Sequence, residues 1–506
     1  MAAQAQVQHR GLLTICVMLA TIMQALDTTI ANVALPYMQG SLSATLDQIN
    51  WVLTSYIVAA AIMTPVTGFL AARFGRKKLF LVTVIGFTVA SVLCGMAASL
   101  EQMVIFRLLQ GVFGAPLVPM SQSVLLDSYP KEQHGSAMAI WGVGVMVGPI
   151  LGPTLGGYLT EAFNWRWVFY INLPVGILTF LGLSAFLSES RLRNIRFDWF
   201  GFLALSVAIG SLQMMLDRGE QLDWFSSTEI VLELVLAGLA LYLFLVHTFT
   251  ADHPFIVPHM FKDRNFSLGL IFIFMVGIIL LATLALLTPY LQNLMGYPVL
   301  TAGSVLAPRG IGTMVAMMAV GRLINVVDAR LLVLTGLLLT AFVLWEMAGY
   351  TPDVSQQTLV VQGVLQGVGL GLMFVPLSTI TFATLPVQFR TEGTALFSLL
   401  RNIGSSIGIS LVIFLLSRNT QVMHSALVEH VTPFNMALRD PAVSHIWDMA
   451  TMTGRAALNA EVTRQATIIA YSNDFKLMMI IALASVPLIF LLRRAQPKAD
   501  EAAVLE

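Results

Sequence analysis

Long apolar runs separated by short polar stretches make up most of this chain. Fourteen such runs lie near residues 11–36, 49–72, 78–98, 103–126, 136–160, 167–188, 198–216, 230–250, 266–290, 301–324, 331–349, 357–380, 391–417 and 475–493. An α-helix needs roughly 20 apolar residues to cross a bilayer. The pattern therefore predicts an all-α polytopic membrane protein with fourteen transmembrane helices. Composition agrees, since only 11% of the 506 residues are charged, against about 25% in soluble domains.

Lysines and arginines are distributed unevenly between the runs. Of 27 in total, 17 fall in one alternating set of loops and in the two tails: Arg10, Arg73, Arg76, Lys77, Lys78, Lys131, Arg191, Arg193, Arg196, Lys262, Arg264, Arg322, Arg330, Arg390, Arg493, Arg494 and Lys498. The opposite short loops hold Arg166 and Arg218. Because cytoplasmic loops are enriched in Lys and Arg, both termini are expected in the cytoplasm.

An internal repeat predicts the architecture. The sequence LQGV at 109–112 in the fourth run recurs at 365–368 in the twelfth, and both are followed by a Pro-hydrophobic-Ser step. Runs 1–6 then correspond to runs 9–14, which is the parallel repeat of major facilitator transporters. We expect a six-helix bundle at 1–190, two inserted spans at 191–262 and a second six-helix bundle at 263–506. The second bundle contains a long polar loop at 418–473, expected on the periplasmic side, with short helices expected around 441–470. This loop could serve as a docking segment, a lid or a plain connector.

One carboxylate, Asp27, lies in the middle of the first run. A charged carboxylate at that depth costs several kcal/mol unless it is protonated, hydrated or paired. Helical spacing places Asp27 on one face with Gln24, Thr28 and Ala31, and this small polar face is expected to point into the protein. A carboxyl group in this position can bind and release a proton, so we expect it to couple proton movement to transport.

The fourth run carries a second charge, Arg107. Helical spacing places this arginine on one face with Gln110, Gly111, Gly114, Ser121 and Gln122. An arginine within a membrane span must face a cavity or a partner. Arg107 is therefore expected either to tune the proton-binding acid, to contact substrate, or simply to hold helices together.

The loop after the second run reads GFLAARFGRKK at 68–78. Its two glycines, Gly68 and Gly75, suit a tight turn between closely packed helices. Together with the repeat, this loop resembles the signature loop of the major facilitator superfamily, in which an acid stands at the position of Ala72. The resemblance implies that Gly68, Arg73, Gly75 and Arg76 take part in conformational switching.

The fifth run carries regularly spaced glycines and prolines: Gly144, Gly148, Pro149, Gly152 and Gly156, with Pro153 and Gly157 beside them. Glycines allow close helix contact and prolines bend a helix, so the run can serve for packing or for flexing. The pattern resembles the motif typical of drug:proton antiporters of this superfamily.

Three further runs extend the resemblance over nearly the whole chain. LDTTIANVALP at 26–36, NWRWVFYINLP at 164–174 and LQMMLDRGEQLDWF at 212–225 resemble the fourteen-span branch and its EmrB-type multidrug permeases. The resemblance implies the major facilitator fold with two inserted helices, and proton-coupled export of amphipathic compounds across a bacterial inner membrane. It also implies a periplasmic adaptor of the membrane-fusion (EmrA) type and a TolC-type outer-membrane channel as partners. Asp27 and Arg107 would couple protons, and neither a cofactor nor a metal is expected.

Polar and aromatic side chains within the spans are candidates for contacting substrate. They are Gln24, Asn32, Tyr56, Gln110, Trp141, Tyr290, Phe374 and Arg401. Arg309 after Pro308, and Arg401 with Asn402, Ser405 and Gly408, could line the cavity of the second half. Core packing is the more frequent reason for any one of these aromatic side chains.

Two other classes of protein compete with a drug exporter. A membrane-embedded enzyme lacks support, because the chain contains no His-Glu-x-x-His, Gly-x-Ser-x-Gly or phosphate-loop sequence. A sensor of transporter fold usually adds a long cytoplasmic domain, and the tails here are short. Within transport, export of a specific metabolite such as a fatty acid or siderophore remains the alternative.

Overall fold

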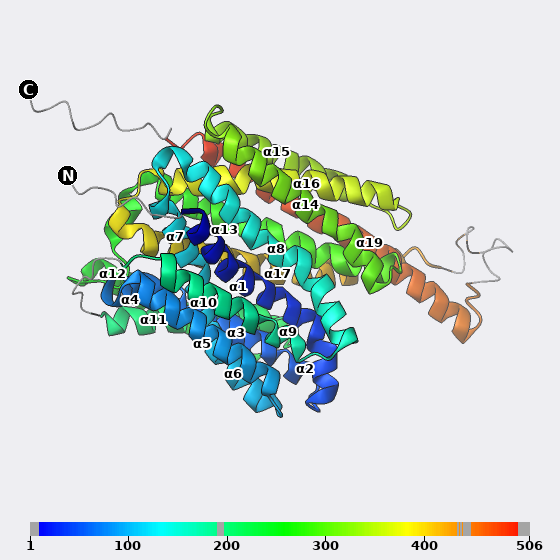
Figure 1. Cartoon of the computed structure of the whole chain (residues 1–506). Coiled ribbons are helices and arrows are strands. Elements are labelled where there is room, and N and C mark those ends of the chain that lie inside the picture. Colours follow the sequence, from blue (N-terminus) through cyan, green and yellow to red (C-terminus); the bar gives the residue numbers. More distant parts are fainter. Residues whose placement is uncertain (1–9, 190–196, 433–434, 436–437, 439–446, 494–506) are drawn as a thin grey trace, which may run out of the picture.

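The fold is a bundle of long helices, and we describe it from a computed structural model (Figure 1). The structure describes residues 10–189, 197–432, 435, 438 and 447–493, and these contain helices but no strand. Thirteen helices are long and apolar enough to span a membrane, and a bent pair counts as a fourteenth. The prediction of an all-α, fourteen-span protein is confirmed. Five of the basic residues that indicated orientation lie outside the described residues: Arg191, Arg193, Arg196, Arg494 and Lys498.

The first half of the chain contains six spans. Their helices are α1 (Arg10–Ser41), α3 (Trp51–Met63) with α4 (Val66–Phe74), α5 (Arg76–Met96), α6 (Leu100–Gly114) with α7 (Leu117–Ser128), α8 (His134–Ala162), and α9 (Trp167–Tyr170) with α10 (Asn172–Phe186); α2 (Leu46–Ile49) and the turn η1 (Lys131–Gln133) are connections. Pro65 and Pro116 stand at the breaks between α3 and α4 and between α6 and α7. Proline lacks the N–H that would continue a helix, and α3 and α4 meet at 57°.

The second half repeats this arrangement. Its helices are α13 (Arg264–Pro289) continuing into η4 (Tyr290–Leu294), α14 (Val299–Leu323), α15 (Ala329–Met347), α16 (Gln356–Ala383), α17 (Arg390–Val428) and α19 (Met452–Ile489), with turns η3 (Pro258–Lys262) and η5 (Val387–Phe389). α13 packs on α17 as α1 packs on α8, and α14 packs on α16 as α3 packs on α6. α15 packs on α16 and α19 as α5 packs on α6 and α10. The helix pairs follow the sequence repeat.

Two helices lie between these halves in sequence, α11 (Trp199–Arg218) and α12 (Thr228–Thr250), joined through η2 (Trp224–Ser226). α11 packs on α12, on α3 of the first half and on α17 of the second. Ser410 of α17 donates a hydrogen bond to the carbonyl of Leu216 at 2.6 Å. α11 therefore bridges the two halves along one side.

The segment at 418–473 differs from the expected loop with short helices near 441–470. α17 continues to Val428, and α19 begins at Met452 and projects from the bundle (Figure 1). Thr451 caps α19 by accepting a hydrogen bond from the Gly454 N–H at 3.1 Å. Leu458, Val462, Ala466 and Ala470 are buried at four-residue spacing, so an apolar stripe supports the first part of this helix, which also carries many polar residues. Residues 433–434, 436–437 and 439–446 of this segment lie outside the described residues.

The beginning of α1 and the end of the described chain lie at one end of the bundle (Figure 1). Thr14 of α1 hydrogen-bonds the Tyr129 hydroxyl after α7 at 2.8 Å, and the Arg493 N–H donates to the Asn265 side chain at 2.9 Å. The two halves meet where α8 packs on α14 and α16, and where α4 and α7 pack on α17. Helix α8 therefore lies between α1 of its own half and the second half.

Candidate proton site and conformational contacts

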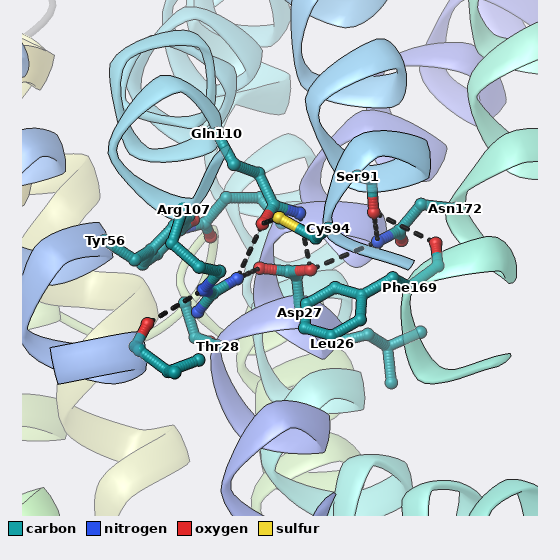
Figure 2. A network of polar contacts seen from close by, with 12 residues as sticks. Leu26, Asp27, Thr28, Tyr56, Ser91, Cys94, Arg107, Gln110, Phe169 and Asn172 are labelled. Atoms are coloured by element: carbon teal, nitrogen blue, oxygen red, sulfur yellow. Dashed lines mark hydrogen bonds and ion pairs between the residues drawn. The ribbon is translucent and has the colours of Figure 1, made fainter. Parts of the chain in front are cut away.

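The carboxylate of Asp27 lies inside the first half and has no exposed surface (Figure 2). Its Oδ2 accepts a hydrogen bond from Arg107 Nη1 at 2.7 Å. Its Oδ1 accepts from Gln110 Nε2 at 2.7 Å and from Asn172 Nδ2 at 3.1 Å. An opposite charge and three donors stabilise the ionised carboxylate against the cost of burial.

The guanidinium of Arg107 is held by several groups besides Asp27. Its Nε donates to the carbonyl of Val52 at 3.0 Å, and its Nη1 donates to Gln110 Oε1 at 2.7 Å. The guanidinium carbon lies 4.3 Å from the centre of the Tyr56 ring, a cation–π contact. Arg107 therefore keeps partners that do not depend on the charge of Asp27.

A second layer of hydrogen bonds orients Asn172 (Figure 2). The Asn172 amide donates to Ser91 Oγ at 2.8 Å, and Ser91 donates to the Phe169 carbonyl at 2.9 Å. Cys94 donates weakly to Gln110 Oε1 at 3.6 Å. The site thus joins α1, α3, α5, α6, α9 and α10 into one buried network, so a change at Asp27 reaches six helices.

Glycines bring the helices of this site together. A Cβ at Gly111 would lie against the Tyr56 carbonyl of α3, and a Cβ at Gly114 would lie against Tyr56 and Phe87. This close approach of α6 to α3 places Arg107 beside Val52 and Tyr56. A side chain at Gly111 would therefore collide with the α3 backbone unless one of the two helices shifted.

The glycine face of α8 packs directly on α1, the helix that carries Asp27. A Cβ at any of these glycines would meet Met18, Ala25, Thr29 or Ile30 of α1; the glycines are Gly144, Gly148, Gly152 and Gly156. Thr29 donates a hydrogen bond to the Gly148 carbonyl at 2.9 Å. Pro149, inside α8, removes one helical hydrogen bond next to this contact. The opposite face of α8 packs on the second half, so α8 can transmit movement between that half and α1.

Two of the expected substrate-contacting aromatics meet across the two halves. The rings of Trp141 on α8 and Phe374 on α16 stack with centroids 5.6 Å apart and planes 14° apart. The Trp141 Nε1–H is buried without a hydrogen-bond partner among the residues that the structure describes. A planar ligand could replace one ring of this pair and satisfy the indole donor.

The other expected substrate contacts are spread over the molecule. Gln24 donates to the Tyr56 hydroxyl at 3.2 Å next to the Asp27 network. Asn32 is exposed and donates to the Thr28 carbonyl. Tyr290 packs on Tyr350 and Tyr471 within the second half. Arg401 has a buried Nη1 for which the described part of the chain supplies no hydrogen-bond partner. Gln110 and Tyr56 belong to the Asp27 network. The structure does not bring these eight residues into one site.

The signature loop lies at a contact between the two halves. Gly75 has φ +89°, a left-handed conformation that favours glycine, and the Lys77 N–H after it donates to Glu189. Gly68 faces Glu392 of α17 so closely that a Cβ would collide with it. Arg73 lies in the last turn of α4 beside this contact.

The signature loop of the family has an acid at the position of Ala72. In this chain, the carboxylate that pairs with the loop comes from another helix. Asp127 at the end of α7 pairs with Arg76 through one oxygen and with Arg390 of α17 through the other, the latter at 2.6 Å. Arg390 also donates to the Leu126 carbonyl at 3.2 Å. Asp127 therefore joins arginines from both halves at the end of the bundle where α1 begins.

Comparison with known proteins places the chain in a transporter family. The Major Facilitator Superfamily profile matches residues 17–409. The fatty acid resistance protein FarB of Neisseria gonorrhoeae is 37% identical over 482 residues, 94% of this chain and 95% of FarB. The multidrug export protein EmrB of Escherichia coli K12 is 39% identical over 427 residues, 84% of this chain and 83% of EmrB. The crystal structure of the human organic anion transporter MFSD10 (TETRAN) has the same fold, with a TM-score of 0.58 and 14% identity over 95% of this chain and 100% of that chain. The chain belongs to the major facilitator superfamily, in the branch that contains EmrB-type export proteins.

Proposed function

We propose that the protein exports amphipathic drugs or toxic compounds across the bacterial inner membrane in exchange for protons. The observation that carries this proposal is the buried pair of Asp27 and Arg107, 2.7 Å apart and without exposed surface. A titratable acid deep in a transporter fold supplies a proton carrier. The similarity to EmrB over most of the chain supports drug export as the coupled process.

The geometry supports a coupling mechanism with two charge states. In the state described here, Asp27 accepts three hydrogen bonds and is stabilised as a carboxylate. Protonation removes the charge that attracts Arg107 and turns one carboxyl oxygen into a donor. Because α8 packs on α1 through its glycine face, weakening the network loosens α1 against α8 and favours rearrangement of the two halves. Substrate would bind between the halves, near the stacked rings of Trp141 and Phe374.

Orientation and partners follow from charge and from family resemblance. The basic residues of loops such as 73–78 gather at the end of the bundle where α1 begins, and we assign this end to the cytoplasm. The projecting part of α19 then faces the periplasm. We propose that it meets a periplasmic adaptor of the membrane-fusion type, which connects to a TolC-type outer-membrane channel.

Export of fatty acids is a second candidate function. FarB, a fatty acid resistance protein, is 37% identical over 94% of this chain. A fatty acid is also an amphipathic compound, so both functions use the same proton cycle and differ in the charge of the headgroup.

Efflux from reconstituted vesicles under a proton gradient tests the proposed function. We expect efflux of cationic dyes or fatty acids to require the gradient, and Asp27→Asn to abolish gradient-driven efflux while leaving helical content unchanged. Glu233→Gln is the matched control, because Glu233 is also a buried carboxylate but lies on α12, which packs on α11. Gradient-driven efflux by the Asp27→Asn variant at the unmodified rate would remove Asp27 from the mechanism.

A further inference from the structure

A second buried carboxylate lies in the other half of the molecule, outside the Asp27 network. Asp474 of α19 is 1% exposed, and within the described residues neither of its oxygens has a hydrogen-bond partner. It also belongs to none of the ion pairs of the described chain. Asp27, by contrast, accepts hydrogen bonds from an arginine and two amides. The two acids therefore have opposite surroundings in one and the same conformation.

The surroundings of Asp474 are apolar and aromatic. One turn before and one turn after it, the buried stripe of α19 carries Ala470 and Met478. Beside this stripe, the rings of Tyr471 and Phe475 stack with centroids 6.4 Å apart. Burial among such groups disfavours a charged carboxylate that has no hydrogen-bond donor. This environment favours the neutral acid, which keeps its proton.

Charged side chains on the helices around Asp474 lie away from it. α19 packs on α13, η4, α15 and α17. A contact of 3.0 Å between His424 of α17 and Asn459 of α19 gives the register of these two antiparallel helices. By that register, Arg401 and Arg418 of α17 lie roughly 12–14 Å from Asp474 along the helix axis. The remaining charged or titratable residues of the four elements are Arg264, Tyr290, Arg330, Glu346, Arg390 and Glu392.

Asp474 lies near the end of the bundle opposite to the start of α1. Ser472 donates a hydrogen bond at 2.6 Å to the carbonyl of Ala348, which directly follows α15. Of the six residues named last, Glu346 and Tyr290 are at this end, where Glu346 accepts a hydrogen bond from α16 and Tyr290 packs on an aromatic ring of α19. The acid is therefore close to the side that we assign to the periplasm, from which a proton enters during export.

A proton is the ligand that suits this site. A metal ion needs several oxygen, nitrogen or sulfur ligands, and the described residues contain no group of three or more His, Cys, Asp or Glu that could hold one. Tyr350, whose ring lies 6.3 Å from that of Phe475, lines a cavity of about 10 Å³, which has room for one water at most. An organic cation does not fit there, whereas a proton needs only one carboxyl oxygen.

We propose that Asp474 is a second proton-binding acid of this transporter, which holds its proton in the described state and releases it when the second half rearranges. This inference rests on the proposed exchange of substrate for protons and adds a second proton to that exchange. On release, the carboxyl O–H bond breaks and water takes the proton. Asp27 and Asp474 then give each half of the molecule its own proton-binding acid.

Infrared spectroscopy of the full-length protein in phosphatidylcholine nanodiscs tests whether Asp474 binds a proton. At about pH 6, the difference spectrum between the unmodified protein and Asp474→Asn should contain the C=O stretching band of a protonated carboxylic acid, and this band should vanish as the pH is raised to about 9. Asp27→Asn should keep the band, and Asp474→Glu should keep it at a shifted frequency. Glu461→Gln, which removes a partly exposed carboxylate of the same helix, is the control and should keep it unchanged. A difference spectrum without the band, or a band that stays constant over this pH range, would overturn the proposal.

Proton counting in proteoliposomes, with ethidium as the transported probe, tests the role of Asp474 in transport. We expect Asp474→Asn to keep its helical content and to exchange ethidium without a gradient at the unmodified rate. Under a gradient, it should move one proton fewer per ethidium than the unmodified protein. An unchanged ratio of protons to ethidium would exclude Asp474 from the proton cycle. Loss of both exchange and gradient-driven transport would show a structural role instead.

The second acid and the proposed function can fail separately. If the unmodified protein exchanges ethidium for protons while neither the band nor the ratio responds to Asp474→Asn, the second acid fails and the export function stands. If the unmodified protein moves neither ethidium nor a fatty acid under a gradient, the export function fails. The infrared band then still decides whether Asp474 binds a proton.

Discussion

Arg107 donates a hydrogen bond of 2.7 Å to Asp27 in a site where neither side chain reaches solvent. The same guanidinium also donates to the Val52 carbonyl and to Gln110. Protonation of Asp27 would therefore remove its attraction for Arg107 while leaving the arginine partly satisfied. This asymmetry is what a proton switch needs, because the neutral state must remain accessible without unfolding the bundle.

The buried pair predicts strong thermodynamic coupling between its two members. Asp27→Asn leaves Arg107 buried without a counter-charge, and Arg107→Gln leaves Asp27 in the same condition; each should lower stability by about 3–5 kcal/mol. The double variant removes both charges, so its loss should be clearly smaller than the sum of the single losses. Thermal midpoints of the four proteins in one detergent measure the coupling. Additive losses would show that the pair does not act as a unit.

Ser91 belongs to the second layer of hydrogen bonds, which orients Asn172. We expect its substitution to lower stability less than substitution of Asp27 or Arg107. Ser91→Ala leaves one Asn172 N–H without its partner and removes the side-chain hydrogen bond to the Phe169 carbonyl, which keeps the Ile171 N–H. An unsatisfied buried group costs about 1–3 kcal/mol. We expect a lower thermal midpoint and slower gradient-driven efflux, because Asn172 is no longer aimed at Asp27. Ser206→Ala is the control, since Ser206 donates only to Phe202 of its own helix. Equal behaviour of the two variants would show that the Ser91 contact does not orient the site.

Because α8 packs on α1, we expect alanine substitutions at two glycines of α8 to have opposite effects on stability. Gly148→Ala places a Cβ against the Ala25 carbonyl, a backbone atom that cannot move alone. It should push α1 away from α8, lower stability and slow efflux. Gly157→Ala meets no atom within 4 Å, and alanine favours a helix over glycine by about 1 kcal/mol. It should be neutral or stabilising. Thermal midpoints and efflux rates of the two variants, measured side by side, test this difference. Similar effects of both substitutions would refute the packing argument.

The sequence predicted the elements better than it predicted the contacts between them. Hydropathy located all fourteen spans, and helical spacing placed Asp27 and Arg107 on inward faces, because both signals lie within one helix. Asn172 was missed as a partner of Asp27, since no periodicity inside α10 says which helix its first turn faces. The available signals were a polar side chain within the apolar run 167–188 and its place in the motif at 164–174, and neither names Asp27 as the partner. Short helices were expected near 441–470, but their continuation into the last span as one helix, Met452–Ile489, was missed, because polar residues dilute the buried stripe in the average composition.

We expect the ion pairs of Asp127 to hold the two halves together at one end of the bundle. It pairs with Arg76 of the first half and Arg390 of the second, so Asp127→Asn leaves two guanidinium groups facing a neutral side chain. Loss of a charged hydrogen bond costs about 1.5–3 kcal/mol, and the halves should separate more often at this end. Cysteines introduced at Ser123 and Thr391, whose hydroxyl oxygens lie 2.9 Å apart, report this separation, because the native Cys16 and Cys94 are buried. Asp127→Asn should slow oxidative cross-linking of this pair by tenfold or more. Glu229→Gln, which breaks the exposed pair with Arg218 elsewhere in the fold, is the control and should leave the cross-linking rate unchanged. If Asp127→Asn also leaves the cross-linking rate unchanged, these ion pairs do not hold the halves together.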